Sequence, residues 1–156
     1  MAMIASYTLQ DWSNIATTAM GALAGIALVA AAAQIILAKA IQKEATAKEI
    51  FSGFLEQSLQ YPHLLSPRDA DIDLSTQTLR GSRDEFLQYE TYIDLMMTAF
   101  ENIYEMFGER RDWRDTMTSY FDWHRKYLQS DAFTAYESGL NPRLAEFLHS
   151  HLARAE

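Results

Sequence analysis

The sequence predicts an all-α protein, in which one N-terminal transmembrane helix continues into a stalk and is followed by a small helical-bundle domain. Two observations lead to this prediction: residues Ile15 to Ala38 carry no charge, and downstream apolar residues recur at steps of three and four. We expect five segments: a short extracytoplasmic N-terminus at 1–14, the transmembrane helix at 15–38, an amphipathic stalk helix at 39–61, an acidic loop at 62–81, and a helical domain that packs with the stalk at 82–156.

The uncharged segment Ile15–Ala38 is long enough to cross a bilayer. At about 1.5 Å per residue it reaches about 36 Å, whereas the hydrocarbon core is about 30 Å thick. A buried core helix and a cleaved signal peptide are the alternatives, but a core helix rarely runs 24 residues without a charge. The apolar run of a signal peptide is about 7–15 residues long and follows basic residues, which residues 1–14 lack. The segment Ile15–Ala38 is only moderately hydrophobic, because it contains many alanines and Gln34. Such a span is expected to pack against another protein and not against lipid alone.

The charges that flank the span predict its orientation. No Lys or Arg precedes it, whereas Lys39, Lys43 and Lys48 follow within ten residues. The positive-inside rule therefore places the C-terminal domain in the cytoplasm and the N-terminus outside, in a cell inner membrane. Tyr7 and Trp12 lie where aromatic rings favour the headgroup level.

A row of small residues within the span predicts a helix–helix interface. Gly21 and Gly25 form a GxxxG pattern, and Thr17, Val29 and Ala33 continue the row at four-residue spacing. Small side chains let two helix backbones approach closely, so that van der Waals packing drives association in lipid. We expect these five residues to bind either a larger membrane protein complex or a second copy of the chain.

The remaining helices are predicted from capping residues and apolar periodicity. We expect Asp11 or Ser13 to cap the first helix and Pro62 to end it. In the stalk, the expected apolar face consists of Ile41, Ile50, Phe51, Phe54, Leu55 and Leu59. A second helix opens at the capping box Ser82–Glu85 and closes at Gly108. Its buried stripe comprises Phe86, Tyr89, Ile93, Met96, Met97, Phe100, Ile103, Tyr104 and Phe107.

Three further helices are expected beyond Gly108. The first spans Glu109 to Leu128, a short one is capped by Asp131, and the last begins at Asn141–Pro142 and runs to about Ala153. The segment between Pro62 and Gly81 shows no periodicity and is predicted to be irregular.

The soluble part is acidic. From Glu49 onward the sequence holds 10 Lys and Arg against 19 Asp and Glu, a net charge of −9. An acidic surface repels nucleic acid and anionic headgroups, and it favours a basic protein partner. The alternative is that the charge only keeps the domain soluble. The chain has no cysteine, so no disulfide framework indicates an oxidising compartment.

No pattern in the sequence predicts an enzyme or a bound cofactor. Asp69, Asp71 and Asp73 resemble the first half of a calcium loop, but Leu74 and Arg80 replace the required glycine and glutamate. The ExxH spacing of Glu146 and His149 is typical of di-iron bundles, which need a second such pair that this chain lacks. GxSxG, P-loop and Rossmann patterns are absent from the sequence. We therefore expect neither a catalytic residue nor a metal ligand.

The aromatic positions of the C-terminal part carry one family resemblance. These positions are Tyr61-Pro-His-Leu-Leu65, Tyr92 with Phe100-Glu101, Asp112-Trp113, Tyr127-Leu128 and Phe133. Over residues 45–150 the chain resembles a loosely defined set of uncharacterised bacterial single-span membrane proteins with a cytoplasmic all-helical domain. The resemblance implies an all-helical domain behind an anchor, and it implies no activity.

These expectations combine into one functional hypothesis and one alternative. The leading hypothesis is a non-enzymatic accessory or interaction subunit, which docks onto a larger membrane complex through its small-residue row and its acidic cytoplasmic domain. The alternative is a self-associating membrane-anchored sensor or adaptor that binds a peptide or small ligand. Its ligand would contact either the 62–81 loop or a groove lined by Met96, Met97, Phe100, Tyr104, Met106 and Phe107.

Overall fold

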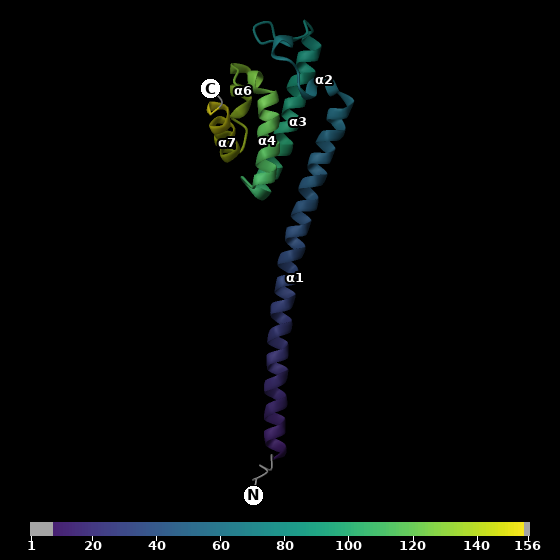
Figure 1. The fold of residues 1–156 in the computed structure, drawn as a ribbon, viewed down its shortest axis with the longest axis vertical. Coiled ribbons are helices and arrows are strands. Elements are labelled where there is room, and N and C mark those ends of the chain that lie inside the picture. Colours follow the sequence, from purple (N-terminus) through teal and green to yellow (C-terminus); the bar gives the residue numbers. More distant parts are fainter. Residues whose placement is uncertain (1–7, 155–156) are drawn as a thin grey trace. The chain divides into compact units, whose positions relative to one another are not determined.

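The computed structural model describes residues 8–154 and is all-α, as predicted (Figure 1). Its helices in that range are α1 (Leu9–Gln60), α2 (Pro62–Leu65), α3 (Arg83–Phe107), α4 (Arg111–Trp123), α5 (Arg125–Leu128), α6 (Asp131–Glu137) and α7 (Pro142–Ala153). A single 3₁₀ turn, η1 (Asp69–Asp71), and two short strands, β1 (Ile72–Asp73) and β2 (Thr78–Leu79), lie between α2 and α3.

The chain divides into two units, Met1–Glu44 and Ala45–Glu156. The boundary falls inside α1, so the first part of the predicted stalk belongs to the N-terminal unit. In that unit α1 is long and apolar enough to span a membrane, with a mean hydropathy of 2.2 over its most apolar window and 0% of that window buried.

Helix α1 begins at Leu9, earlier than the predicted caps Asp11 and Ser13 would place it. The Asp11 N–H donates to Thr8 Oγ1 at 3.3 Å, and the Thr8 N–H donates to Asp11 Oδ2 at 2.9 Å. This reciprocal pair is a capping box in which Thr8 is the cap and Asp11 is its third-position partner. The predicted interfacial residue Tyr7 lies outside the described residues.

In the second unit, α1 contributes a narrower apolar stripe than predicted. Phe54 and Ala47 are buried, and Ile50 and Phe51 are partly buried against the same core. Ile41 of the predicted face falls in the N-terminal unit and is 61% exposed. Within the second unit, Leu59 is 80% exposed and Leu55 is also exposed. The stripe is narrow because α1 packs against the domain on one side only, which leaves residues a third of a turn away uncovered.

Helix α3 is the central helix of the domain, and its predicted apolar stripe is buried from Phe86 to Tyr104. The Ser82 side chain accepts a hydrogen bond from the Glu85 N–H at 3.2 Å, as the predicted cap requires. The second bond of the predicted capping box does not form, because the Ser82 N–H donates to the Leu79 carbonyl at 2.9 Å and not to the Glu85 side chain. Gly108 ends the helix with φ +57°, in the left-handed region that favours glycine, and its N–H donates to the Tyr104 carbonyl at 2.7 Å.

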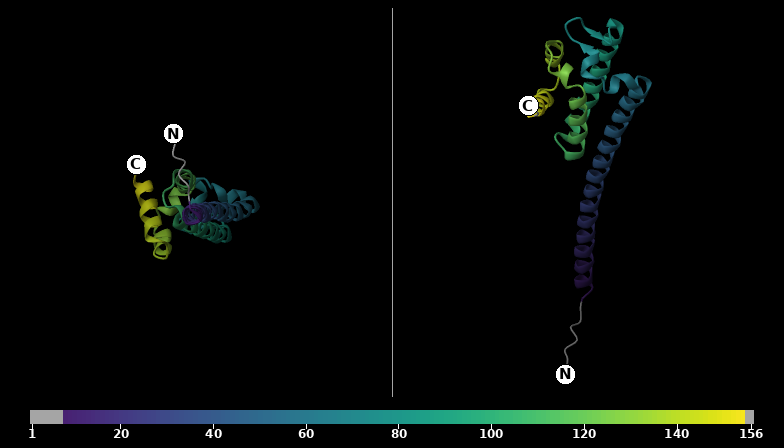
Figure 2. Two further views of the ribbon diagram at one scale, coloured as in Figure 1. Left: turned by 90° about the horizontal axis from the view of Figure 1, so that it is seen from below. Right: turned by 45° about the horizontal axis from the view of Figure 1, so that its top comes forward.

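Aromatic rings from three helices meet in the core. The ring of Phe54 in α1 lies 5.5 Å from Tyr120 in α4 and 6.2 Å from Phe100 in α3, centroid to centroid. Helix α7 packs on the opposite side of α4, where Phe147 contacts Phe121 at 5.9 Å (Figures 1 and 2). Helices α3 and α4 therefore lie between α7 and the last turns of α1.

The predicted single helix from Glu109 to Leu128 is wrong, because it breaks at His124 into α4 and α5. His124 has φ −112° and ψ 13°, which is outside the helical region, and its ring is buried against α3. The cap of α6 also differs from the prediction: Ser130, and not Asp131, accepts from the Phe133 N–H at 3.4 Å. The cap of α7 at Asn141 is confirmed, with a 3.0 Å bond from the Arg143 N–H.

The segment predicted to be irregular, Pro62 to Gly81, contains α2, η1 and a small antiparallel hairpin. In the hairpin Ile72 pairs with Leu79 and Asp73 with Thr78. Gln77 has φ +51° in the hairpin turn, and Arg80 has φ +52° directly after β2. Strands of two residues are too short to show an alternating pattern, which explains why the sequence does not predict them.

Candidate interaction site

The five predicted docking residues lie along one row of α1 in the N-terminal unit. All five are exposed, and a Cβ added at Gly21 or Gly25 would meet no other atom within 4 Å. The backbone of α1 is therefore open to close approach by another helix at the two glycines. Docking through this row stays a prediction from the spacing of the sequence.

The hydroxyl groups at the start of this row are already hydrogen-bonded. Thr17 Oγ1 donates to the Ser13 carbonyl at 2.9 Å, and Thr18 Oγ1 donates to the Asn14 carbonyl at 2.9 Å. A hydroxyl that bonds back to its own helix leaves no unsatisfied donor in hydrocarbon. These threonines therefore fit a helix surrounded by lipid or by another apolar helix.

Large apolar side chains of the N-terminal unit are uncovered around the whole circumference of α1. Side chains such as Met20, Leu23, Ile26, Leu28 and Ile36 expose about two-thirds or more of their surface. Burying one such side chain contributes about 1.5–3 kcal/mol, and this unit gains none of that stabilisation from the rest of the described chain. No other part of the described chain therefore covers this stretch of α1.

A second surface, which the sequence analysis missed, lies between α1 and α3 in the C-terminal unit. Two adjoining hollows of about 160 and 180 Å³ share Gln57 and Leu95 and together form one shallow groove. We call this surface the neutral groove. It is lined by Ile50, Gly53, Phe54, Gln57 and Tyr61 of α1, Leu64 of α2, and Gln88, Thr91, Tyr92, Leu95, Thr98, Ala99 and Asn102 of α3.

The neutral groove combines an apolar floor with uncharged polar edges. Phe54 and Tyr92 form the floor, with ring centroids 5.4 Å apart, and the Tyr92 hydroxyl lies 3.1 Å from Ser58 Oγ. None of its lining residues is charged. A signal was present in the sequence, since Gln88, Thr91, Leu95, Thr98 and Asn102 form an uncharged row at helical spacing.

The methionine and aromatic residues considered as a ligand groove instead form the core. Met96, Met97 and Phe100 are fully buried, and Tyr104 is buried beside Phe147 at 5.7 Å between ring centroids. Met106 and Phe107 are partly buried against the same core. This set of side chains therefore provides packing and not an open binding surface.

The acidic side chains of the 62–81 segment are held by neighbouring groups. Asp71 pairs with Arg68 at 3.0 Å and with Arg80 at 3.8 Å. Hydrogen bonds from Ser75 and Thr76 lower the pKa of Asp73 to about 2. Asp71 and Asp73 therefore stabilise the 3₁₀ turn and the hairpin of this segment.

Two histidines of α7, His149 of the ExxH pattern and His151, contact acidic side chains of other helices. His149 Nε2 pairs with Glu137 of α6, and His151 Nε2 lies 2.9 Å from Asp122 of α4. Glu90 accepts a hydrogen bond from the Tyr127 hydroxyl at 3.1 Å, and Glu101 accepts one from the Asn141 N–H at 2.5 Å. These carboxylates and imidazoles connect helices to one another.

His124 is the one histidine of the described chain that is fully buried, at 1% exposure. Its Nδ1 lies 3.0 Å from the Tyr89 hydroxyl, and Nε2 has no hydrogen-bond partner among the described residues. Burial lowers the pKa of His124 to about 4, with the Leu65 backbone acting in the opposite direction. The imidazole is therefore neutral at pH 7 and packs as part of the core.

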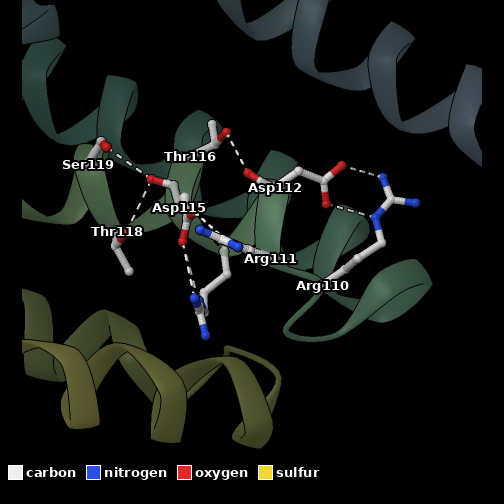
Figure 3. A network of polar contacts seen from close by, with 8 residues as sticks. Arg110, Arg111, Asp112, Asp115, Thr116, Thr118 and Ser119 are labelled. Carbon is white, nitrogen blue, oxygen red and sulfur yellow. Dashed lines mark hydrogen bonds and ion pairs between the residues drawn. The ribbon is translucent and has the colours of Figure 1, made fainter.

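Charged side chains at the start of α4 pair with one another (Figure 3). The Arg110 guanidinium binds both carboxylate oxygens of Asp112 at 2.8 Å and lies 4.1 Å from the centroid of the Phe107 ring. Arg114 and Arg111 pair with Asp115 at 3.3 and 3.8 Å. Three arginines against two aspartates leave a net charge of only +1, so this exposed network provides no strongly basic patch.

Comparisons with protein-family models, with curated proteins and with solved structures found no match for this chain. The small-residue row of α1 and the neutral groove are the two candidate interaction surfaces of the described chain.

Proposed function

We propose that this chain is a non-enzymatic, single-span membrane protein that acts as an accessory or interaction subunit. Its α1 helix crosses the membrane and docks onto a larger membrane protein complex, and its acidic helical domain covers a cytoplasmic surface of that complex. The observation that carries the proposal is the uncovered apolar part of α1, which has a mean hydropathy of 2.2 over a window in which no residue is buried.

The small-residue row supports docking by α1. Thr17, Gly21 and Gly25 present little side-chain bulk, and both glycines have open space where a Cβ would project. Lipid provides no hydrophobic force between helices, so close backbone packing is the main source of association energy. A partner helix that packs along this row would also cover part of a span that is only moderately hydrophobic.

The flanking charges support a cytoplasmic domain in an inner membrane. Lys39, Lys43 and Lys48 lie just beyond the apolar segment, and no basic residue precedes it. The domain carries a net charge of −9, which favours a basic protein surface over nucleic acid or anionic lipid as its cytoplasmic contact.

Co-purification with variants of the small-residue row tests the proposal. The tagged chain is solubilised gently from its native membrane, and the bound proteins are identified by mass spectrometry. We expect a stoichiometric larger membrane complex, which Gly21→Leu together with Gly25→Leu should remove. The matched control is Ala27→Leu with Ala31→Leu, which has the same spacing on a different row of α1 and should leave the complex bound.

Two outcomes would contradict this account. If both leucine pairs leave the complex unchanged, the row is not the docking surface. If the chain is recovered only with itself, the self-associating sensor or adaptor is the better hypothesis. Cross-linking within the span separates the two functions independently, because it joins either two identical chains or two different ones.

A further inference from the structure

We propose that a hollow between the end of α3 and the start of α7 binds a free amino acid, with the ligand's carboxylate on Arg143 and its ammonium group on Glu105. This inference goes beyond the proposed function, because it gives the soluble domain a small-molecule ligand. It lies entirely within the C-terminal unit and does not depend on the span.

The hollow lies where the ends of two helices meet. It is lined by Tyr104 and Glu105 of α3, by Gly108 that ends α3, and by Asn141 and Arg143 at the start of α7. Its volume is about 300 Å³, at the lower end of the range of about 300–1,000 Å³ for small-molecule sites. A Cβ built on Gly108 would meet no atom within 4 Å, so the wall of the hollow is open there. This space suits a ligand of the size of an amino acid.

Tyr104 leaves its hydroxyl group unused at this hollow. Only 9% of the residue is exposed, and its ring stacks on Phe147 with centroids 5.7 Å apart. Within residues 8–154 the hydroxyl has no hydrogen-bond partner, and it does not belong to the unpaired polar atoms that are sealed off inside the domain. The ring therefore packs in the core, whereas the hydroxyl is left for a ligand in the hollow.

The hollow also contains two opposite charges that do not pair. Arg143 and Glu105 both line it, but no ion pair joins either of them to a charged group of the described residues. Burial raises the pKa of Tyr104, and the nearby charge of Arg143 opposes this rise without cancelling it. The hydroxyl is therefore protonated at pH 7, so that it can donate to a carboxylate beside Arg143.

Asn141 connects the two charged residues. Its Oδ1 accepts a hydrogen bond from the Arg143 N–H at 3.0 Å, and its Nδ2 donates to Glu105 Oε1 at 3.4 Å. Its own N–H donates to Glu101 of α3 at 2.5 Å. These bonds fix the start of α7 against α3, so the cation and the anion are held at the hollow before a ligand arrives.

The charges around the hollow favour a zwitterion over a simple ion. Glu109 and Glu146 also raise the pKa of Tyr104, so their carboxylates lie near its hydroxyl. A simple anion such as phosphate would be repelled by these carboxylates, and a simple cation would be repelled by Arg143. An amino acid presents both charges close together, and each can pair with the opposite charge of the hollow. The dipole of α7 further favours the carboxylate at the start of that helix.

Binding of L-amino acids to the full chain in mild detergent tests the inference. Each standard amino acid is added during thermal unfolding, and isothermal titration then measures the Kd of those that raise Tm. We expect at least one amino acid to bind. Its N-acetyl and its α-carboxamide derivatives each lack one of the two charges and should bind about tenfold or more weakly. No rise in Tm with any amino acid, or equal binding of the derivatives, would overturn the inference.

Variants of the lining residues show whether binding takes place in this hollow. Arg143→Gln and Glu105→Gln should each weaken binding about tenfold or more, because each removes one ionic contact. Tyr104→Phe keeps the ring stack on Phe147 and removes only the hydroxyl, so it should weaken binding about threefold to tenfold. The Tm of each variant without ligand shows that the domain is still folded.

The matched controls change exposed charges outside the hollow. They are Arg154→Gln, just beyond the other end of α7, and Glu56→Gln in α1, and both should leave the Kd unchanged. An unchanged Kd in Arg143→Gln or Glu105→Gln, or an equal loss in the controls, contradicts the inference. None of these results depends on whether a membrane protein co-purifies through α1, so this inference and the proposed function can fail separately.

Discussion

The Tyr89 hydroxyl and the Nδ1 atom of His124 lie 3.0 Å apart in the core, where α3 meets the break between α4 and α5. Both side chains are almost completely buried, and their ring centroids are 5.6 Å apart. Burial raises the pKa of Tyr89 and lowers that of His124, so both groups are neutral near pH 7. The bond therefore joins two uncharged groups, and it can be disturbed by acid.

We expect the free energy of unfolding to fall as the pH drops from about 6.5 towards 4. The pKa of His124 is about 4 in the folded chain and 6.5 in the unfolded chain, so only the unfolded state takes up a proton in this window. The full loss is about 3 kcal/mol. Denaturant titrations of the full chain in mild detergent, at a series of pH values, measure it.

His124→Asn is the matched control for this pH dependence. An asparagine carbonyl can still accept from Tyr89, but it does not titrate. The variant should therefore lose the extra pH dependence of the wild type between pH 4 and 6.5. If both chains show the same slope, His124 does not govern acid stability.

The last turns of α1 should contribute strongly to the stability of the domain. Phe54 packs between Tyr92, Phe100 and Tyr120, so Phe54→Ala should lower the free energy of unfolding by about 3–5 kcal/mol. Leu59→Ala changes an 80% exposed side chain on the same helix and should cost less than about 0.5 kcal/mol. Similar losses for the two variants would mean that α1 does not pack in the core as described.

Gly108 should tolerate alanine poorly. Its φ of +57° costs about 1–2 kcal/mol for a residue with a Cβ, although no atom lies within 4 Å of the added group. Gly139 has no such φ, and its Cβ would lie 3.6 Å from the Tyr136 carbonyl, an ordinary contact. Thermal unfolding of Gly108→Ala and Gly139→Ala should therefore show a clear loss only for the first variant.

Much of the fold was predictable because its strongest signals are local. The charge-free run from Ile15 to Ala38, the cap at Ser82 and the proline at Pro142 each act within a few residues, and α1, α3 and α7 follow from them. The break at His124 was not predictable, because it depends on a ring that packs against Tyr89, 35 residues earlier in the chain.

The two candidate surfaces also differ in how far local sequence patterns predict them. The small-residue row can be read from spacing within one helix, and the structure places it on α1 with open space at both glycines. The neutral groove combines Gln57 with Leu95, which come from two helices, so its existence depends on how α1 and α3 pack. The sequence contains the uncharged row of α3, but only the fold shows that α1 lies beside it.

The central claim is that α1 crosses a membrane with the helical domain on the cytoplasmic side, and thiol labelling in intact cells tests it most directly. Single cysteines are introduced by Ala5→Cys before the span and by Ser150→Cys in α7, in a chain that otherwise has none. Ala5→Cys should react with a membrane-impermeant maleimide, and Ser150→Cys should react only after permeabilisation. Ready labelling of Ser150→Cys in intact cells would contradict the topology.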